Sequence, residues 1–184
     1  ARCRDAKAAA TAALSARGRL REASVWKTLA TKERLCEELD AMVASHATSA
    51  ADAATPAVPE RWAALPPLSP AWEKPMLVRR DAALRALADQ DAAVAHASRV
   101  EQGSQVRAEI LLELEIALGL DSPAELQAQR LALQVKQLRQ RFQSAASGGT
   151  ARERLLAWCA EPGVADARDR QRCEKVFAAI AKAQ

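Results

Sequence analysis

Aromatic residues, glycine and long apolar runs are scarce in this chain of 184 residues. Aromatic side chains make up 3% of it, tyrosine is absent, and there are only six glycines. Strands draw on aromatic and β-branched residues, so little material for a β-sheet is present. Alanine, leucine, arginine, glutamate and glutamine prevail, and these residues favour helices. With 49% apolar residues the chain can bury a core, and we expect an almost wholly α-helical protein.

The longest apolar runs span a few residues, far below the roughly 20 that a membrane-spanning helix needs. No apolar signal core follows the basic start of the chain. We therefore predict a cytoplasmic protein that does not insert into a membrane. The chain opens with alanine and not methionine, so we also expect it to be a piece of a longer protein.

Signatures of metal, nucleotide and disulfide chemistry are missing too. The four cysteines form no C-x-x-C pair and have no histidine near them in sequence, which argues against zinc and against a dense disulfide framework. Cys36 and Cys173 fall on apolar helix stripes, where packing is the expected role, whereas Cys3 lies between Arg2 and Arg4 at the chain start. There is no G-x-x-x-x-G-K-[ST], G-x-G-x-x-G or H-E-x-x-H motif, so we predict no cofactor and no metal.

Hydrophobic periodicity predicts seven helices. They are expected at about 4–20, from Ser24 to Val43, from Pro70 or Pro75 to Ala97, from about 104 to Leu118, from Ser122 to Phe142, from Thr150 to Cys159, and from about Arg168 to Lys182. Gly103 is expected to break the chain between the third and fourth, and Gly119 to end the fourth. Two capping boxes, Ser122 to Glu125 and Thr150 to Glu153, predict helix starts.

These elements divide the chain into four segments. We predict an N-terminal helical pair over 1–50, a linker and proline-rich connector over 51–68, a helical core with a hairpin over 69–146, and a C-terminal helical pair over 147–184. The expected fold class is all-α, an array or bundle of about seven helices with a long central helix and a helical hairpin in the C-terminal half. One closed bundle and stacked helical pairs both remain open. Exposed seams would favour a homo-oligomer.

The expected hairpin carries a resemblance to a known family. Its residues are Arg107 to Gly119 (RAEILLELEIALG), then Ser122-Pro123, Arg130 and Gln134-Val135-Lys136-Gln137-Leu138. They resemble the C-terminal part of the bacterial domain-of-unknown-function family numbered 349, which shows an Arg, a Leu-Cys pair, a Leu-Glu pair, a Gly, a Ser-Pro, an Arg and Gln-Val-x-x-Leu. The family cysteine falls on Leu111 here, which indicates that this cysteine has a packing role.

An upstream stretch, from Arg61-Trp62 to Arg79-Arg80 and Leu84, resembles the repeated unit of the same family. The resemblance covers about residues 60–142. It implies a helical, repeat-bearing cytoplasmic protein of bacteria, cut from a longer chain. It brings no established activity and no catalytic residue.

Candidate catalytic side chains are few. Glu109, Glu113 and Glu115 form the nearest approach to a carboxylate cluster, and we interpret them as solvated helix charges. We expect His46 and His96 at the surface. The four tryptophans are expected to anchor the core, although tryptophans can also stack on bases. We therefore predict no enzymatic activity.

The arrangement of charge suggests a binding function. Residues 1–35 carry nine Lys/Arg against three Asp/Glu, residues 36–126 carry seven against fifteen, and residues 127–147 carry four against none. Our leading hypothesis is a non-enzymatic interaction or scaffold protein that binds a protein or a ribonucleoprotein. The second hypothesis is salt-dependent, sequence-nonspecific nucleic-acid binding through basic helix faces. The candidate residues for either partner are Arg17, Arg19, Arg21, Lys27, Arg130, Lys136, Arg139 and Arg141.

Overall fold

The computed structural model describes residues 2–46, 57–143 and 150–182, without the side chains of 2–9, 19, 46 and 140–143. These residues form helices and no strand, which confirms the all-α class. The helices are α1 (Arg2–His46), α2 (Val58–Ala63), α3 (Pro70–Ala88), α4 (Gln90–Leu118), the short 3-10 helix η1 (Ala124–Leu126), α5 (Gln127–Gln143), α6 (Ala151–Ala160) and α7 (Ala167–Lys182). None of the described helices is long and apolar enough to cross a membrane.

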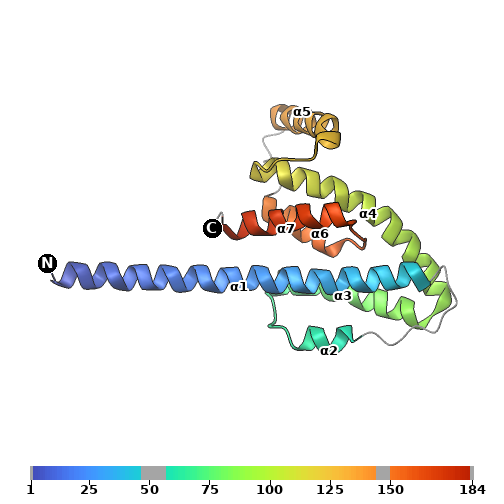
Figure 1. Ribbon diagram of the computed structural model, residues 1–184, viewed down its shortest axis with the longest axis horizontal. Coiled ribbons are helices and arrows are strands. Elements are labelled where there is room, and N and C mark those ends of the chain that lie inside the picture. The colour runs from blue at the N-terminus through green and yellow to red at the C-terminus, as the bar shows by residue number, and fades with distance from the viewer. Residues whose placement is uncertain (1, 47–56, 144–149, 183–184) are drawn as a thin grey trace.

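The helices pack around the C-terminal half of α1. There α1 contacts both α3 and α4, while α6 and α7 pack against α4. Figure 1 shows α4 arching away from the end of α3, with α5 beyond the far end of α4 and α2 on the other side of α1. The N-terminal part of α1 projects well past the other helices.

A single buried cluster joins α1, α2, α3, α4, α6 and α7. Trp26, Trp62, Trp72 and Trp158 all lie in it, so the prediction that tryptophans anchor the core is confirmed. The rings of Trp26 and Trp72 meet edge to face, with centroids 5.7 Å apart, which ties α1 to α3. Cys36 and Cys173 are buried as well, as expected for packing residues.

The expected N-terminal pair is wrong, because α1 runs unbroken through residues 2–46. Ser24, at which the second helix was expected to begin with a serine cap, donates from Oγ to the carbonyl oxygen of Arg21 inside α1. No proline interrupts this stretch, and a glycine such as Gly18 costs a helix only about 1 kcal/mol. Continuing the helix therefore costs less than ending it. The apolar spacing from Val25 through Leu29 and Cys36 predicts a packing stripe that includes Val25, but Val25 is exposed.

The predicted long helix to Ala97 is also wrong, because it ends before Asp89. That residue adopts an extended backbone and accepts hydrogen bonds from the N–H groups of Asp91 and Ala92, so it caps α4. Gly103 does not break the chain and lies buried inside α4. A Cβ at this position would overlap the carbonyl oxygen of Pro162, so glycine is needed there for close packing.

Two of the predicted helix signals are confirmed and one is wrong. Gly119 ends α4 in the left-handed conformation, with φ 67°. Thr150 and Glu153 form both hydrogen bonds of a capping box at the start of α6. Ser122 does not cap a helix, because Pro123 precedes η1 and α5 begins only at Gln127.

The hairpin packs through a different side of α5 than the one predicted. The spacing of Leu131, Val135 and Leu138, four and three residues, predicts a packing seam on one side of this helix, but all three side chains are exposed to solvent. Gln129 and Leu133 instead face α4 and line a groove of about 670 Å³ together with residues of α4 and α7. The pairing of α4 with α5 is therefore loose.

Apart from the N-terminal helical pair, the predicted division into segments stays a prediction. Residues 51–56 of the linker lie outside the described residues, and so does the boundary between the last two segments at 146–147. Within the rest of the connector, α2 buries Val58 and Trp62 in the core, so this part is more than a spacer.

Candidate functional site

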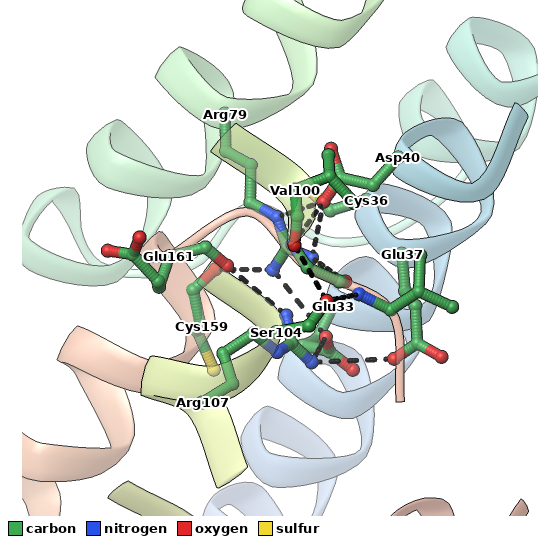
Figure 2. Close-up of polar contacts among 12 residues, drawn as sticks. Glu33, Cys36, Glu37, Asp40, Arg79, Val100, Ser104, Arg107, Cys159 and Glu161 are labelled. Carbon is green, nitrogen blue, oxygen red and sulfur yellow. Dashed lines mark hydrogen bonds and ion pairs between the residues drawn. The ribbon is translucent and has the colours of Figure 1, made fainter. Parts of the chain in front are cut away.

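The most concentrated chemistry in the described residues is a buried ionic network where α1, α3, α4 and the turn between α6 and α7 meet (Figure 2). Each of its members has a buried side chain that is charged or titratable. They are Glu33, Glu37 and Asp40 of α1, Arg79 of α3, and His96 and Arg107 of α4. We call this set the ionic network.

Arg79 links three elements. Its Nε and Nη2 lie 2.9 Å and 2.7 Å from Oδ2 of Asp40, while Nη1 donates to the carbonyl oxygen of Cys159 and Nη2 to that of Gly163. The N–H of Gly163 donates to the same Asp40 oxygen at 3.0 Å. The pair thus fixes the turn after α6 against both α1 and α3, and its fully satisfied geometry is what a buried ion pair requires.

Arg107 makes an equivalent link from α4. Its Nη2 lies 2.6 Å from Glu33 and 3.4 Å from Glu37, and its Nη1 donates to the carbonyl oxygen of Glu161. The guanidinium carbon lies 3.8 Å from the centre of the Trp158 ring, a cation–π distance. Arg107 therefore combines charge pairing with packing in the core.

His96 is buried, so its predicted surface location is wrong. Its Nε2 lies 2.9 Å from Oδ1 of Asp40, and its Nδ1 lies 3.0 Å from Nη2 of Arg99. Arginine can only donate hydrogen bonds, so Nδ1 must be the acceptor and Nε2 must carry the proton. The neutral imidazole then donates to Asp40. The side chain of His46 lies outside the description.

Asp40 is held in its ionised form by its surroundings. Burial by itself would raise the pKa of this carboxyl group, but the hydrogen bond from His96, the charge of Arg79 and the N–H of Gly163 outweigh burial. The pKa of Asp40 therefore lies below its ordinary value of 3.8. Burial raises the pKa of the neighbouring Cys36 thiol to about 12, so this thiol is no nucleophile at neutral pH.

The ionic network has the chemistry of a structural lock. Three carboxylates face Arg79, Arg107 and the partly exposed Arg170, which lies 2.9 Å from Glu37, so the charges balance. A groove of about 340 Å³ between α1 and α7 reaches Glu33 and Glu37, but both carboxylates are already bound to arginines. No group of three or more metal-ligating side chains occurs among the described residues.

A second buried ion pair contradicts the interpretation of Glu115 as a solvated charge. Glu115 is buried, and its two oxygens lie 2.7 Å and 2.9 Å from Nε and Nη2 of Arg172 in α7. It also accepts from the hydroxyl of Ser122. Glu109 is exposed as predicted, and Glu113 lies half-buried beside Arg154. The three glutamates do not converge on one site.

The eight predicted binding residues fall into two separate groups, one on α1, in or next to its projecting part, and one on α5 (Figure 1). Arg17, Arg21 and Lys27 are exposed, as are Lys136 and Arg139. Arg130 is engaged in hydrogen bonds within the chain, because its Nη1 donates to the carbonyl oxygen of Leu120 and to the hydroxyl of Ser122. The side chains of Arg19 and Arg141 lie outside the description. The structure therefore does not assemble these residues into one continuous basic face.

Comparison with known proteins adds no assignment. No family model matches the chain, and neither a curated protein nor a solved structure matches it significantly. The resemblance to the family numbered 349 stays a prediction.

Proposed function

We propose that this chain is a non-enzymatic interaction protein whose core holds the N-terminal part of α1 out as a binding arm for an anionic surface of a protein or a ribonucleoprotein. The observation that carries the proposal is the exposure of this segment. Leu14 and Leu20 are 68% and 71% exposed, and Trp26 is the first core residue among the described side chains of α1. We call residues 10–25 the arm.

The arm is helical because of its own composition and its attachment. Alanine has the highest helix propensity, and the packed half of α1 supplies the costly nucleus from which a helix extends. Sixteen residues of helix reach roughly 24 Å from the core. The arm is thus a pre-ordered surface, and a partner does not need to fold it on binding.

The charge of the arm sets the kind of partner. Arg17 and Arg21 lie one turn apart, both are exposed, and no ion pair of either side chain occurs among the described residues. Apolar Leu14 and Val25 lie on the same side of the helix, at spacings of three and four residues from these arginines. An anionic surface with an apolar patch complements this combination.

The proposal is tested by reversing charge on α1. The variant Arg17→Glu/Arg21→Glu/Lys27→Glu and the control Lys74→Glu/Lys175→Glu/Lys182→Glu change net charge equally, and all six residues are exposed. Each protein is used to retrieve partners from its source cells, with and without nuclease, and the yields are quantified by mass spectrometry. We expect a defined set of partners that the control retains and the α1 variant loses. Equal recovery by both variants contradicts the proposal.

Sequence-nonspecific nucleic-acid binding is the second candidate, favoured by the exposed side chains of Arg17 and Arg21, which form no ion pair with any described residue. It predicts that labelled RNA and DNA bind with an affinity that falls steeply between about 50 and 200 mM salt. Partners lost after nuclease treatment, together with this salt dependence, support it. Absence of nucleic-acid binding at low salt excludes it and leaves a protein partner.

A further inference from the structure

The described part of α5 presents an apolar stripe that none of the described residues covers. Leu131 is 63% exposed, Leu138 is 52% exposed, and Val135 between them is exposed too. Their spacing of four and three residues places all three on one side of the helix. This is the spacing of a helix-pairing seam, and it is narrower than the apolar face of a helix that lies on a membrane.

The outward orientation of the stripe is set by contacts on the opposite side of α5. Arg130 donates to the carbonyl oxygen of Leu120 and to Ser122, which in turn donates to the buried Glu115. Leu133 faces α4 in the groove. Turning the stripe inward would break the contacts of Arg130 and expose Leu133.

The charge on α5 restricts what can cover the stripe. Residues 127–143 contain four basic residues and no acidic one. Arg139 follows Leu138 directly and is exposed, and Lys136 is exposed at the rim of the groove. In a pair of α5 helices, the exposed Arg139 beside the stripe would meet no acidic residue of the second α5, which disfavours pairing between two copies. The complementary surface is acidic and carries its own apolar seam.

We propose that the stripe of α5 binds an acidic amphipathic helix of another protein, with leucines at heptad positions and glutamates beside them. A nucleic acid would use the charges and leave the three apolar side chains in water. An anionic membrane would bury a wider apolar face, with aromatic residues, than the stripe offers. This site is separate from the arm of α1, and the proposal does not depend on binding by that arm.

The test uses a synthetic helix as probe. A labelled peptide of about three heptads, with leucine at positions a and d and glutamate at e and g, is titrated with the full chain, and anisotropy is recorded. The like charges at e and g keep the peptide from pairing with itself. We expect a Kd of about 10 μM or tighter that weakens with salt. The same peptide with lysine at e and g, or with serine at a and d, should not bind.

Substitutions in the chain test whether the peptide binds at the stripe. We expect Leu131→Gln/Leu138→Gln and Lys136→Glu/Arg139→Glu each to weaken binding at least about tenfold. The controls Val78→Gln/Val94→Gln and Lys74→Glu/Lys175→Glu, at exposed residues outside α5, should leave it unchanged. Unfolding transitions close to that of the wild-type chain show that each variant is folded.

Other outcomes overturn the proposal. They are failure of the acidic peptide to bind, binding that survives Leu131→Gln/Leu138→Gln, and stripe-dependent binding to phosphatidylglycerol vesicles in place of the peptide. A doubled mass in light scattering that the same substitutions abolish overturns it as well, because it assigns the stripe to a second copy. Reversing charge at Arg17, Arg21 and Lys27 should leave peptide binding intact. The proposal for the stripe and the proposal for the arm can therefore be contradicted separately.

Discussion

Asp40 accepts two contacts from Arg79 on a single carboxylate oxygen, and both residues are almost completely buried. The pair joins α1 to α3, and through Gly163 it also holds the turn between α6 and α7. These elements lie far apart in the sequence, so the pair decides how they fit together.

Replacing Arg79 by methionine should reduce the free energy of unfolding by about 3–5 kcal/mol, because Asp40 is left as an uncompensated buried charge. Urea unfolding followed by circular dichroism measures the change. The control is Arg34→Met, since Arg34 and Glu174 form an exposed pair that contributes at most about 1 kcal/mol. Equal effects of the two substitutions would show that the Arg79 pair does not stabilise the fold.

Lowering the pH should remove the contribution of Asp40 to the free energy of unfolding. Because its pKa is lower in the folded than in the unfolded chain, this carboxylate stabilises the fold above pH 3.8, and the stabilisation is lost as the pH falls through the folded value. The wild-type chain should therefore be more stable than Asp40→Asn at neutral pH, and the difference should shrink below pH 3.8. Urea titrations over a pH series measure it. A difference that does not change with pH contradicts the assignment.

Two glycine substitutions should have opposite effects. Gly103→Ala places a Cβ against Pro162 and should destabilise the chain by about 1–3 kcal/mol through overpacking. Gly18→Ala lies in an exposed part of α1 with nothing within 4 Å of the added atom, and it should stabilise the helix by about 0.5–1 kcal/mol. Thermal unfolding of both variants gives the signs. A stabilising Gly103→Ala would rule out the close approach of α4 to the turn.

The described thiols should be unreactive in the folded protein. Burial raises the pKa values of Cys36, Cys159 and Cys173. In a Cys3→Ser variant, a colorimetric disulfide reagent at about pH 8 should therefore label these thiols only as the chain unfolds. Unfolding by urea should make all three thiols reactive at the same urea concentration. Rapid labelling without denaturant would contradict their burial.

Local sequence signals predicted local structure well. The composition predicted an all-α chain, Gly119 ends α4, and the capping box at Thr150 forms, because each signal depends on neighbouring backbone alone. Ser24 and Ser122 carry the same capping chemistry, yet one lies inside a continuous helix and the other binds Glu115. Only tertiary contacts distinguish such cases.

The ionic network was missed because charged side chains were assigned to the surface. A signal for it exists in the helix periodicity. Asp40 lies four residues after Cys36 and three before Val43, in the middle of an apolar stripe. In α4, the residues His96, Val100, Gly103, Arg107, Leu111 and Leu114 recur at spacings of three and four and are all buried. Charged residues in register with such a stripe indicate buried ion pairs, but their partners on other helices follow only from the fold.

The projection of α1 as a binding arm is tested most directly by site-specific photo-crosslinking in the cells that make the protein. A benzophenone amino acid replaces Leu20 of the arm, or Val78 of α3 as the control, because the two side chains are 71% and 61% exposed. We predict adducts of discrete mass from position 20 that are absent from position 78 and that disappear when Arg17, Arg21 and Lys27 are reversed to glutamate. No adduct at position 20, or the same adducts at both positions, would contradict the account.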